Sequence, residues 1–160
     1  MTSGFETLNL HPQLKQAIDA LGFKEMTPIQ QKVLQFTLAG HDAIGRAQTG
    51  TGKTAAFLIS VMNDLLKNPL QESRFRGEPR ALILAPTREL ALQIASDAKE
   101  LAKFTNLRLM TLLGGVDFDK QKAQLDAGFI DIIVATPGRL IDFIEQKTVW
   151  LDRLECFISN

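Results

Sequence analysis

The sequence predicts an α/β fold built on an open, doubly wound and mainly parallel sheet. From residue 42 onward, short runs of consecutive apolar residues alternate with amphipathic helical patterns. Strands that are apolar at nearly every position are typical of a parallel sheet covered by helices on both faces. Right-handed helical crossovers then give an open sheet whose ligands lie at the carboxyl ends of the strands. A chain of 160 residues, 45% of them hydrophobic, suffices for one such domain.

Two amphipathic helices are expected ahead of the sheet. The first covers residues 11–21, where apolar side chains recur at the spacing of one helix face, and Gly22 follows as the residue that ends it. The second covers residues 28–38, with Thr27 as its N-cap and Pro28 at its first helical position. Each helix would pack its apolar stripe against the rest of the domain.

The alternating part of the chain predicts strands and helices in regular succession. Strands are expected at residues 42–47, 80–85, 107–113, 131–135 and 155–159, and helices at residues 53–66, 88–104, 117–127 and 138–146. The polar stretch 68–79 has a proline near each end and is expected to be a surface loop. The sequence contains no internal repeat and no sign of a second domain.

The composition favours a soluble domain without a strong overall electric field. Eighteen basic residues balance eighteen acidic ones, so any contact with nucleic acid must come from a local patch. The single Cys156 excludes an internal disulfide. The N-terminus lacks the pattern of a secretory signal, and no apolar run approaches the roughly 20 residues that cross a bilayer. These features predict a cytoplasmic protein that makes no contact with a membrane. A monomer is expected, although the sequence does not determine the oligomeric state.

The most informative segment is a glycine-rich loop, AQTGTGKT at residues 47–54, between an expected strand and an expected helix. Gly50 and Gly52 allow a tight turn that brings successive N–H groups onto phosphate oxygens, and the helix N-terminus adds partial positive charge. Lys53 can reach the β- and γ-phosphates, and the Thr54 hydroxyl can ligate Mg²⁺. The alternative is a plain turn that caps the helix, but a lysine there opposes the helix dipole unless an anion is bound. The loop therefore predicts a nucleoside triphosphate site.

Four further segments accompany this loop: residues 22–30 (GFKEMTPIQ), 86–91 (PTRELA), 114–115 (GG) and 136–139 (TPGR). Together with the loop and the isolated aromatic Phe5, they resemble in order and spacing the N-terminal motifs of the DEAD-box ATP-dependent RNA helicases, and among these the bacterial RNA-degradosome type. In that family Ala47 is the usual first residue of the loop, whereas Met26 stands where the family often has proline. The resemblance runs from Phe5 to the last residues.

This resemblance implies an N-terminal RecA-like P-loop domain over residues 1–160, with an adenine-recognition helical segment at 1–40 and the α/β core at 41–160. The later strands of the sheet and a second, C-terminal helicase domain would be absent from this sequence. ATP and Mg²⁺ are the implied cofactors. RNA and proteins of the RNA-degradation machinery are the implied partners, and the parent protein would hydrolyse ATP to unwind or remodel RNA.

The functional residues of the family carry over motif by motif. The implied nucleotide-binding residues are Phe5, Phe23, Gln30, Gln48, Thr49, Gly50, Thr51, Gly52, Lys53, Thr54 and Ala55. Lys53 and Thr54 would act in catalysis, and Thr54 would hold Mg²⁺ together with the nucleotide. The implied RNA-binding residues are Pro86, Thr87, Arg88, Gly114, Gly115, Thr136, Pro137, Gly138 and Arg139.

The chemistry of these side chains supports the implied roles. The Gln30 amide has one acceptor and two donors, which can pair with N6 and N7 of adenine and would mismatch guanine. Phe5 would stack on the base. The donors that follow the second and fourth expected strands reach the same face of the sheet and suit phosphates rather than base edges, so RNA binding should be largely independent of sequence.

A structural role is the alternative for several of the RNA-binding residues. Thr87 and Thr136 have the residue type and position of helix N-caps. Arg139 has two nearby acidic residues, Asp142 and Glu145, with which it could form an ion pair. Capping and phosphate binding are compatible, because a capped helix N-terminus can still hold a phosphate.

None of the expected strands ends in the aspartate that holds Mg²⁺ in such folds. By the spacing of the resemblance, Asn160 falls at about the first position of the Asp-Glu-Ala-Asp motif. We therefore expect this chain to bind nucleotide weakly and not to turn it over. Three other readings stay open: a catalytically dead RNA-binding or regulatory module with a degenerate acidic motif, an inert truncation product, and a GTPase, although no guanine-reading Asn-Lys-x-Asp segment occurs.

Overall fold

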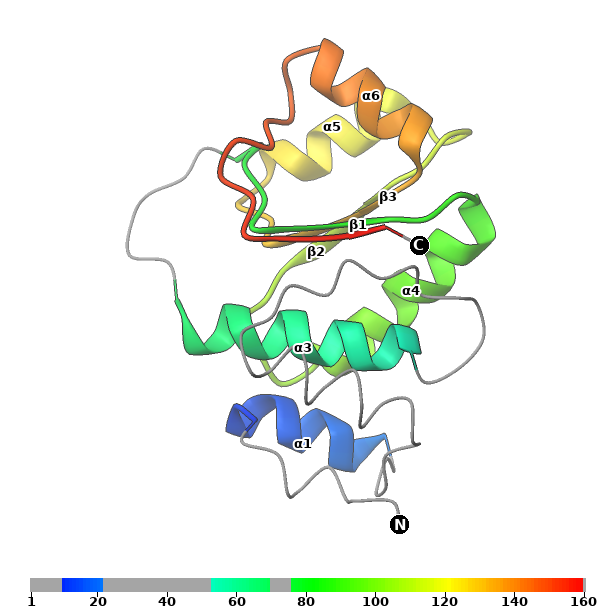
Figure 1. Ribbon diagram of the computed structural model, residues 1–160. Helices are drawn as coiled ribbons and strands as arrows, with labels where there is room; N and C mark the ends of the chain where they lie inside the picture. The colour runs from blue at the N-terminus through cyan, green and yellow to red at the C-terminus, as the bar shows by residue number, and fades with distance from the viewer. Residues whose placement is uncertain (1–9, 22–52, 70–75, 160) are drawn as a thin grey trace.

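The computed structural model describes residues 10–21, 53–69 and 76–159, with the backbone alone for residues 53–55 (Figure 1). The elements in chain order are α1 (Pro12–Ala20), α3 (Lys53–Lys67), β1 (Ala81–Leu84), α4 (Arg88–Leu101), β2 (Leu109–Leu112), α5 (Phe118–Asp126), β3 (Ile132–Ala135), α6 (Pro137–Glu145) and β4 (Cys156–Ser159). The strand expected at residues 42–47, the helix at 28–38 and most of the loop at 68–79 lie outside the described residues.

The described strands form one parallel sheet in the order β2-β3-β1-β4. Ala81 of β1 is in register with Ile132 of β3 on one side and with Cys156 of β4 on the other. Leu109 of β2 pairs in turn with Ile132. The predicted parallel α/β architecture is confirmed. Since every strand runs in the same direction, all carboxyl ends lie at one edge of the sheet and all amino ends at the opposite edge.

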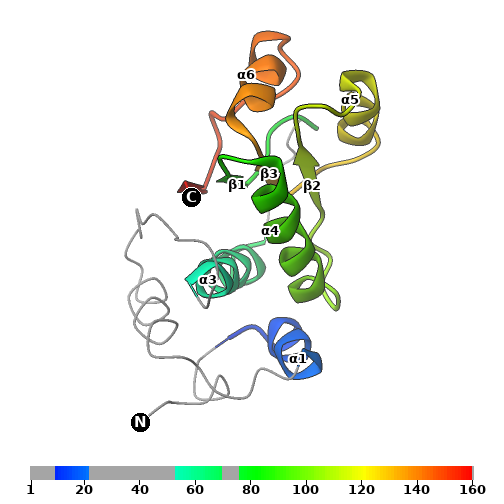
Figure 2. The same ribbon diagram turned by 90° about the vertical axis from the view of Figure 1, so that its right-hand side faces the viewer.

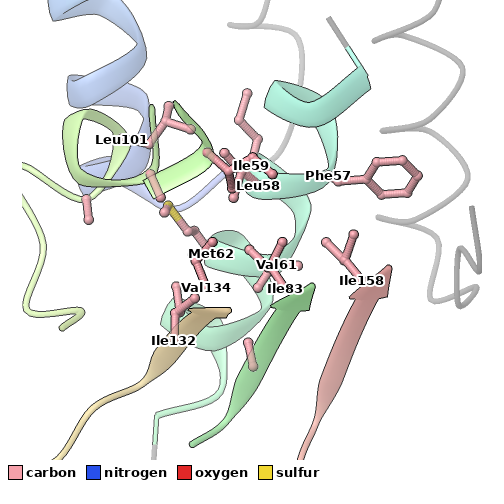
Figure 3. Close-up of a cluster of buried hydrophobic side chains, with 14 of the residues drawn as sticks. Phe57, Leu58, Ile59, Val61, Met62, Ile83, Leu101, Ile132, Val134 and Ile158 are labelled. Atoms are coloured by element: carbon pink, nitrogen blue, oxygen red, sulfur yellow. The ribbon is translucent and has the colours of Figure 1, made fainter. Parts of the chain in front are cut away.

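Helices cover both faces of this sheet (Figures 1 and 2). One face packs against α3 and α4, with α1 beyond them, through a core that includes Leu58, Met62, Ile83 and Val134 (Figure 3). The other face packs against α5 and α6 through a second core of side chains, among them Leu82, Leu125, Ile133, Leu140 and Phe143. Neighbouring residues of one strand therefore enter different cores, which explains why the strands read as continuous apolar runs.

The observed elements are shorter than the apolar patterns that predict them. The helix expected at residues 88–104 ends at Leu101, because the next turn tightens: the Thr105 amide bonds to the carbonyl of Ala102 at 2.8 Å. The strand expected at residues 107–113 pairs with β3 over Leu109–Leu112 alone. The apolar residues at the ends of these patterns pack against the core without belonging to a regular element.

A buried ion pair lies at the amino edge of the sheet. The Arg80 side chain is only 4% exposed, and its Nε and Nη2 atoms lie 2.7 and 3.0 Å from the two carboxylate oxygens of Glu155. Nη1 donates to the carbonyl oxygen of Leu65 at 3.2 Å, and Nη2 donates to the carbonyl oxygen of Asn68. Burial works against the charge of Arg80, but the hydrogen bond and charge of Glu155, together with the charges of Asp131 and Asp64, outweigh it and raise the pKa of Arg80. The pair joins β1, the start of β4 and the end of α3.

None of the described helices is both long enough and apolar enough to pass through a lipid bilayer.

Candidate nucleic-acid interface

Three loops meet at the carboxyl edge of the sheet. They follow β1, β2 and β3, and they lead into the N-termini of α4, α5 and α6. The predicted RNA-binding residues within them are Pro86, Thr87, Arg88, Gly114, Gly115, Thr136, Pro137, Gly138 and Arg139. All are exposed except Thr136 and Arg139, which are half-buried. Residues that are far apart in the sequence therefore share one edge, as the predicted fold requires.

Direct contacts join the loop after β2 to the loop after β3 and to α6, and the side chain of Arg88 from α4 lies beside it. The amide of Gly114 donates to the Thr136 hydroxyl at 3.4 Å, and Arg139 Nη1 donates to the carbonyl oxygen of Val116 at 2.7 Å. A Cβ atom at Gly115 would lie 3.1 Å from Nη1 of Arg88. The three loops thus form one continuous surface.

The two glycines of the loop after β2 differ in what they permit. Gly115 has φ +81°, a backbone conformation that an L side chain rarely adopts. Gly114 has no heavy atom within 4 Å of the position that its Cβ would take, so packing within the domain does not require glycine there. Open space beside a glycine backbone is suited to the close approach of a ligand.

The capping alternative holds for Thr87 and only in part for Thr136. Thr87 is the N-cap of α4, and its hydroxyl accepts from the amide of Leu90 at 3.3 Å. Thr136 occupies the N-cap position of α6, but its side chain makes no capping hydrogen bond. Its hydroxyl instead donates to the carbonyl oxygen of Leu112 at 3.5 Å and accepts from Gly114. Thr136 therefore connects the loops after β2 and β3.

Arg139 is held inside the domain more firmly than the sequence suggests. Its side chain is 14% exposed, and Nη1 donates to the side-chain oxygen of Gln121 at 3.1 Å as well as to Val116. The predicted pairing with Asp142 is confirmed, since Nε lies 3.5 Å from its carboxylate, although Nε is buried and makes no hydrogen bond at that distance. The guanidinium lies 5.9 Å from the ring centroid of Phe118. Most of the group therefore faces protein.

Gln121 is the residue of this region that the sequence prediction missed. It is 3% exposed, and its amide nitrogen donates to the carbonyl oxygen of Leu113 at 3.2 Å. A signal was available, because Gln121 stands in helical register with Phe118 and Leu125 on the inward face of α5. A polar side chain at a core position needs a hydrogen-bonded partner, and here it has two.

The predicted nucleotide-binding residues fall largely outside the described part of the chain. This applies to Phe5, Phe23, Gln30, Gln48, Thr49, Gly50, Thr51 and Gly52. Lys53, Thr54 and Ala55 form the first turn of α3, which begins at Lys53 as the pattern predicted. The N-termini of α3 and α4 lie on the same side of the sheet (Figure 1).

The side-chain charges at this edge are mixed, whereas the helix N-termini favour an anion. The N-termini of α4, α5 and α6 lie at this edge, and each contributes partial positive charge and amides outside the helical bonding pattern. Arg88 adds an exposed guanidinium. Glu89 and the N-cap Asp117 bring negative charge to the same helix ends. Discrete donors rather than a strong net field would therefore guide a phosphate.

The fold and this edge together define a doubly wound α/β domain of the kind that binds phosphate-bearing ligands at the carboxyl ends of its strands. The family model described as DEAD/DEAH box helicase matches residues 27–159. The chain belongs to this family, which confirms the family and the fold class predicted from the sequence.

The curated relatives have consistent names. The chain is 60% identical over 156 residues to the ATP-dependent RNA helicase RhlB of Pseudomonas aeruginosa, an alignment that covers 98% of this chain and 39% of the relative. The proteins of the same name from Erwinia tasmaniensis and Shewanella baltica are 49% and 46% identical. These alignments cover 98% and 99% of this chain and 36% of each relative. The chain thus spans less than two fifths of the length of these relatives.

Proposed function

We propose that this chain is the ATP-binding and RNA-binding N-terminal domain of an ATP-dependent RNA helicase. The family, the names of the relatives and the joined loops at the carboxyl edge support the proposal. The whole protein would hydrolyse ATP and use the cycle of binding and release to unwind or remodel RNA. We further propose a cytoplasmic, monomeric protein that works with the RNA-degradation machinery, as the resemblance implies.

The observation that carries the RNA part is the contact between the loops. Because Gly114 bonds to Thr136 and Gly115 lies against Arg88, the predicted RNA-binding motifs act as one surface rather than three separate turns. Its exposed donors are backbone amides, hydroxyls and the Arg88 guanidinium. Such donors recognise phosphate and sugar oxygens, so the bound RNA would be held by its backbone without regard to sequence.

For the nucleotide, the proposal rests on the loop at residues 47–54 and on α3. Lys53 would contact the β- and γ-phosphates, and Thr54 would ligate Mg²⁺ together with the nucleotide. Gln30 would read the adenine edge, with Phe5 stacked on the base. ATP would therefore be preferred over GTP through hydrogen bonds rather than through the phosphates.

Calorimetric titration with ADP and with GDP, each in the presence of Mg²⁺, tests the nucleotide assignment. We expect heat of binding from ADP and none from GDP. Lys53→Ala should abolish ADP binding. Lys67→Ala, at the other end of α3, is the matched control and should bind ADP as wild type does. Equal binding of ADP by wild type and Lys53→Ala would refute the assignment of the phosphate loop.

Fluorescence anisotropy with a labelled single-stranded RNA tests the RNA assignment. Arg88→Ala should weaken binding to RNAs of different sequence by the same factor. It should also lower the slope of log affinity against log salt by about 0.7, the loss of one phosphate contact on a single strand. Lys99→Ala, in the last turn of the same helix, should leave both unchanged. An unaltered salt slope in Arg88→Ala would show that Arg88 does not contact a phosphate.

A further inference from the structure

The turn that carries Gly114 and Gly115 is held at both ends by two side chains from neighbouring helices. Gln121 of α5 binds the carbonyl oxygen of Leu113, which precedes the glycines, at 3.2 Å. Arg139 of α6 binds the carbonyl oxygen of Val116, which follows them, at 2.7 Å. The two glycines lie between these anchored carbonyls and are themselves exposed.

The two anchoring side chains also bind each other. Nη1 of Arg139 donates to Oε1 of Gln121 at 3.1 Å, so one guanidinium nitrogen serves both Val116 and Gln121. Gln121 must accept from Arg139 and donate to Leu113 at the same time. Among side chains of this length, the amide alone offers an acceptor and a donor on one planar group, because an ionised glutamate has no donor and a lysine has no acceptor.

The surroundings keep this pair in one arrangement. Gln121 is 3% exposed, and the Arg139 guanidinium lies over the Phe118 ring while Nε faces Asp142. Hydrogen bonds in such a shielded site are stronger than on the surface, and breaking one leaves a buried polar atom without a partner. The turn is therefore fixed from beneath, while its outer side stays open at Gly114.

We propose that Gln121 is a positioning residue for RNA binding: together with Arg139 it fixes the Gly114–Gly115 turn in the conformation that meets an RNA phosphate. This inference rests on the proposed RNA-binding function. Gln121 touches no RNA, since it lies below the turn. Because the turn is already ordered, it loses little conformational entropy when RNA binds, and this strengthens binding.

Gln121→Met tests the proposal, because methionine keeps the length and volume of the side chain but neither hydrogen bond. Amide hydrogen exchange of residues 113–117 should become faster by about tenfold, the consequence of losing one buried hydrogen-bond anchor. Affinity for a labelled single-stranded RNA should fall by a similar factor, whereas ADP affinity should not change. Gln124→Met, one turn along the exposed side of α5, is the matched control and should alter neither quantity.

A second variant covers the case in which Gln121→Met does not fold. Gln121→Glu has the same shape and keeps the acceptor for Arg139, but it replaces the donor to Leu113 with an oxygen. It should loosen the turn and weaken RNA binding as well. Gln121 and Arg139 act as a unit, so their effects on RNA affinity should not add. The double variant Gln121→Met/Arg139→Met should lose no more RNA affinity than the single variant that loses more.

The results separate the inference from the function on which it rests. Faster exchange confined to the turn, with weaker RNA binding and unchanged ADP binding, supports the positioning role. Unchanged exchange of residues 113–117 overturns it, and so does unchanged RNA affinity beside a loosened turn. If the wild-type chain binds no RNA, the RNA-binding function fails for this chain and the positioning role fails with it, even where exchange shows that Gln121 holds the turn.

Discussion

Replacing Arg80 with methionine tests how much the buried ion pair at the amino edge contributes to stability. Methionine retains most of the apolar stem of arginine, so the change isolates the guanidinium. It removes both contacts with Glu155 and the hydrogen bonds to the carbonyl oxygens of Leu65 and Asn68. These carbonyls belong to the end of α3, where the helix itself supplies no partner.

The size of the effect follows from what is left behind. Glu155 is 31% exposed and regains water, so its carboxylate adds little to the loss. The carbonyl of buried Leu65 costs about 1–3 kcal/mol when it is left without a partner, whereas Asn68 is exposed and its carbonyl regains water. The loss should therefore reach about 3 kcal/mol, the lower end of the range for breaking a buried ion pair. The free energy of unfolding of a domain is of the order of 5–15 kcal/mol, so this loss would be a large fraction of it.

Urea unfolding followed by circular dichroism measures the loss. For a slope of about 2 kcal/mol per molar, the midpoint of Arg80→Met should fall by about 1.5 M with an unchanged slope. Arg153→Met is the control, since Arg153 is 47% exposed and its pairing with Glu78 at 3.7 Å should contribute about 1 kcal/mol or less. If Arg80→Met loses no more than this control, the guanidinium does not hold α3 to the sheet.

Three further substitutions probe packing and charge. Gly77→Ala would press a methyl group against the carbonyl oxygen of Thr148 and should lower the free energy of unfolding, measured in urea, by about 1–3 kcal/mol. Gly138→Ala is the control, because its methyl group would meet nothing within 4 Å and should leave the stability unchanged. Phe143→Ala empties a site of 0% exposure and should cost about 3–5 kcal/mol in the same assay. Burial raises the pKa of Asp131 above 3.8 despite the Arg108 amide and nearby arginines, so the folded state disfavours the carboxylate at neutral pH. Asp131→Asn should therefore be more stable than wild type at about pH 7, and this advantage should vanish as the pH falls through the raised pKa toward about 4; an advantage independent of pH would contradict the assignment.

The sequence predicted the described elements because each leaves a local signal. β1 and β3 are continuous apolar runs, and the amphipathic patterns predicted helices where α3, α4, α5 and α6 lie. The order of the strands could not be predicted, since right-handed crossovers are compatible with several orders and the choice depends on contacts between distant segments. The apolar runs from residue 42 onward predict a parallel sheet. No pattern within a single segment predicts that β1 lies between β3 and β4.

The sequence predicted which residues form the candidate site, but it did not predict the hydrogen bonds and contacts among them. Glycines and threonines after apolar strands mark ligand-binding turns, and Arg88 and Gly115 meet as such an arrangement requires. The contact of Arg139 with Val116 depends on how α5 and α6 pack beside each other on one face of the sheet. The spacing of residues along the sequence does not determine that packing. Gln121 carried a signal in its inward position on α5, but its partners became clear only from the fold.

The two edges of the sheet perform different tasks. A charged residue precedes each strand, as Arg80, Arg108, Asp131 and Glu155 do, and the contacts among them tie the amino edge together: the amide of Arg108 binds the Asp131 carboxylate at 2.9 Å, and Arg80 binds Glu155. Proline, glycine or threonine follows β1, β2 and β3 within two residues at the carboxyl edge, where the N-termini of α4, α5 and α6 lie. The ion pair of Arg80 with Glu155 is thus about one strand length from the groups that would bind phosphate. Because sites at this separation with no shared partner act independently, Arg80→Met should destabilise the chain without changing its RNA affinity below the unfolding transition.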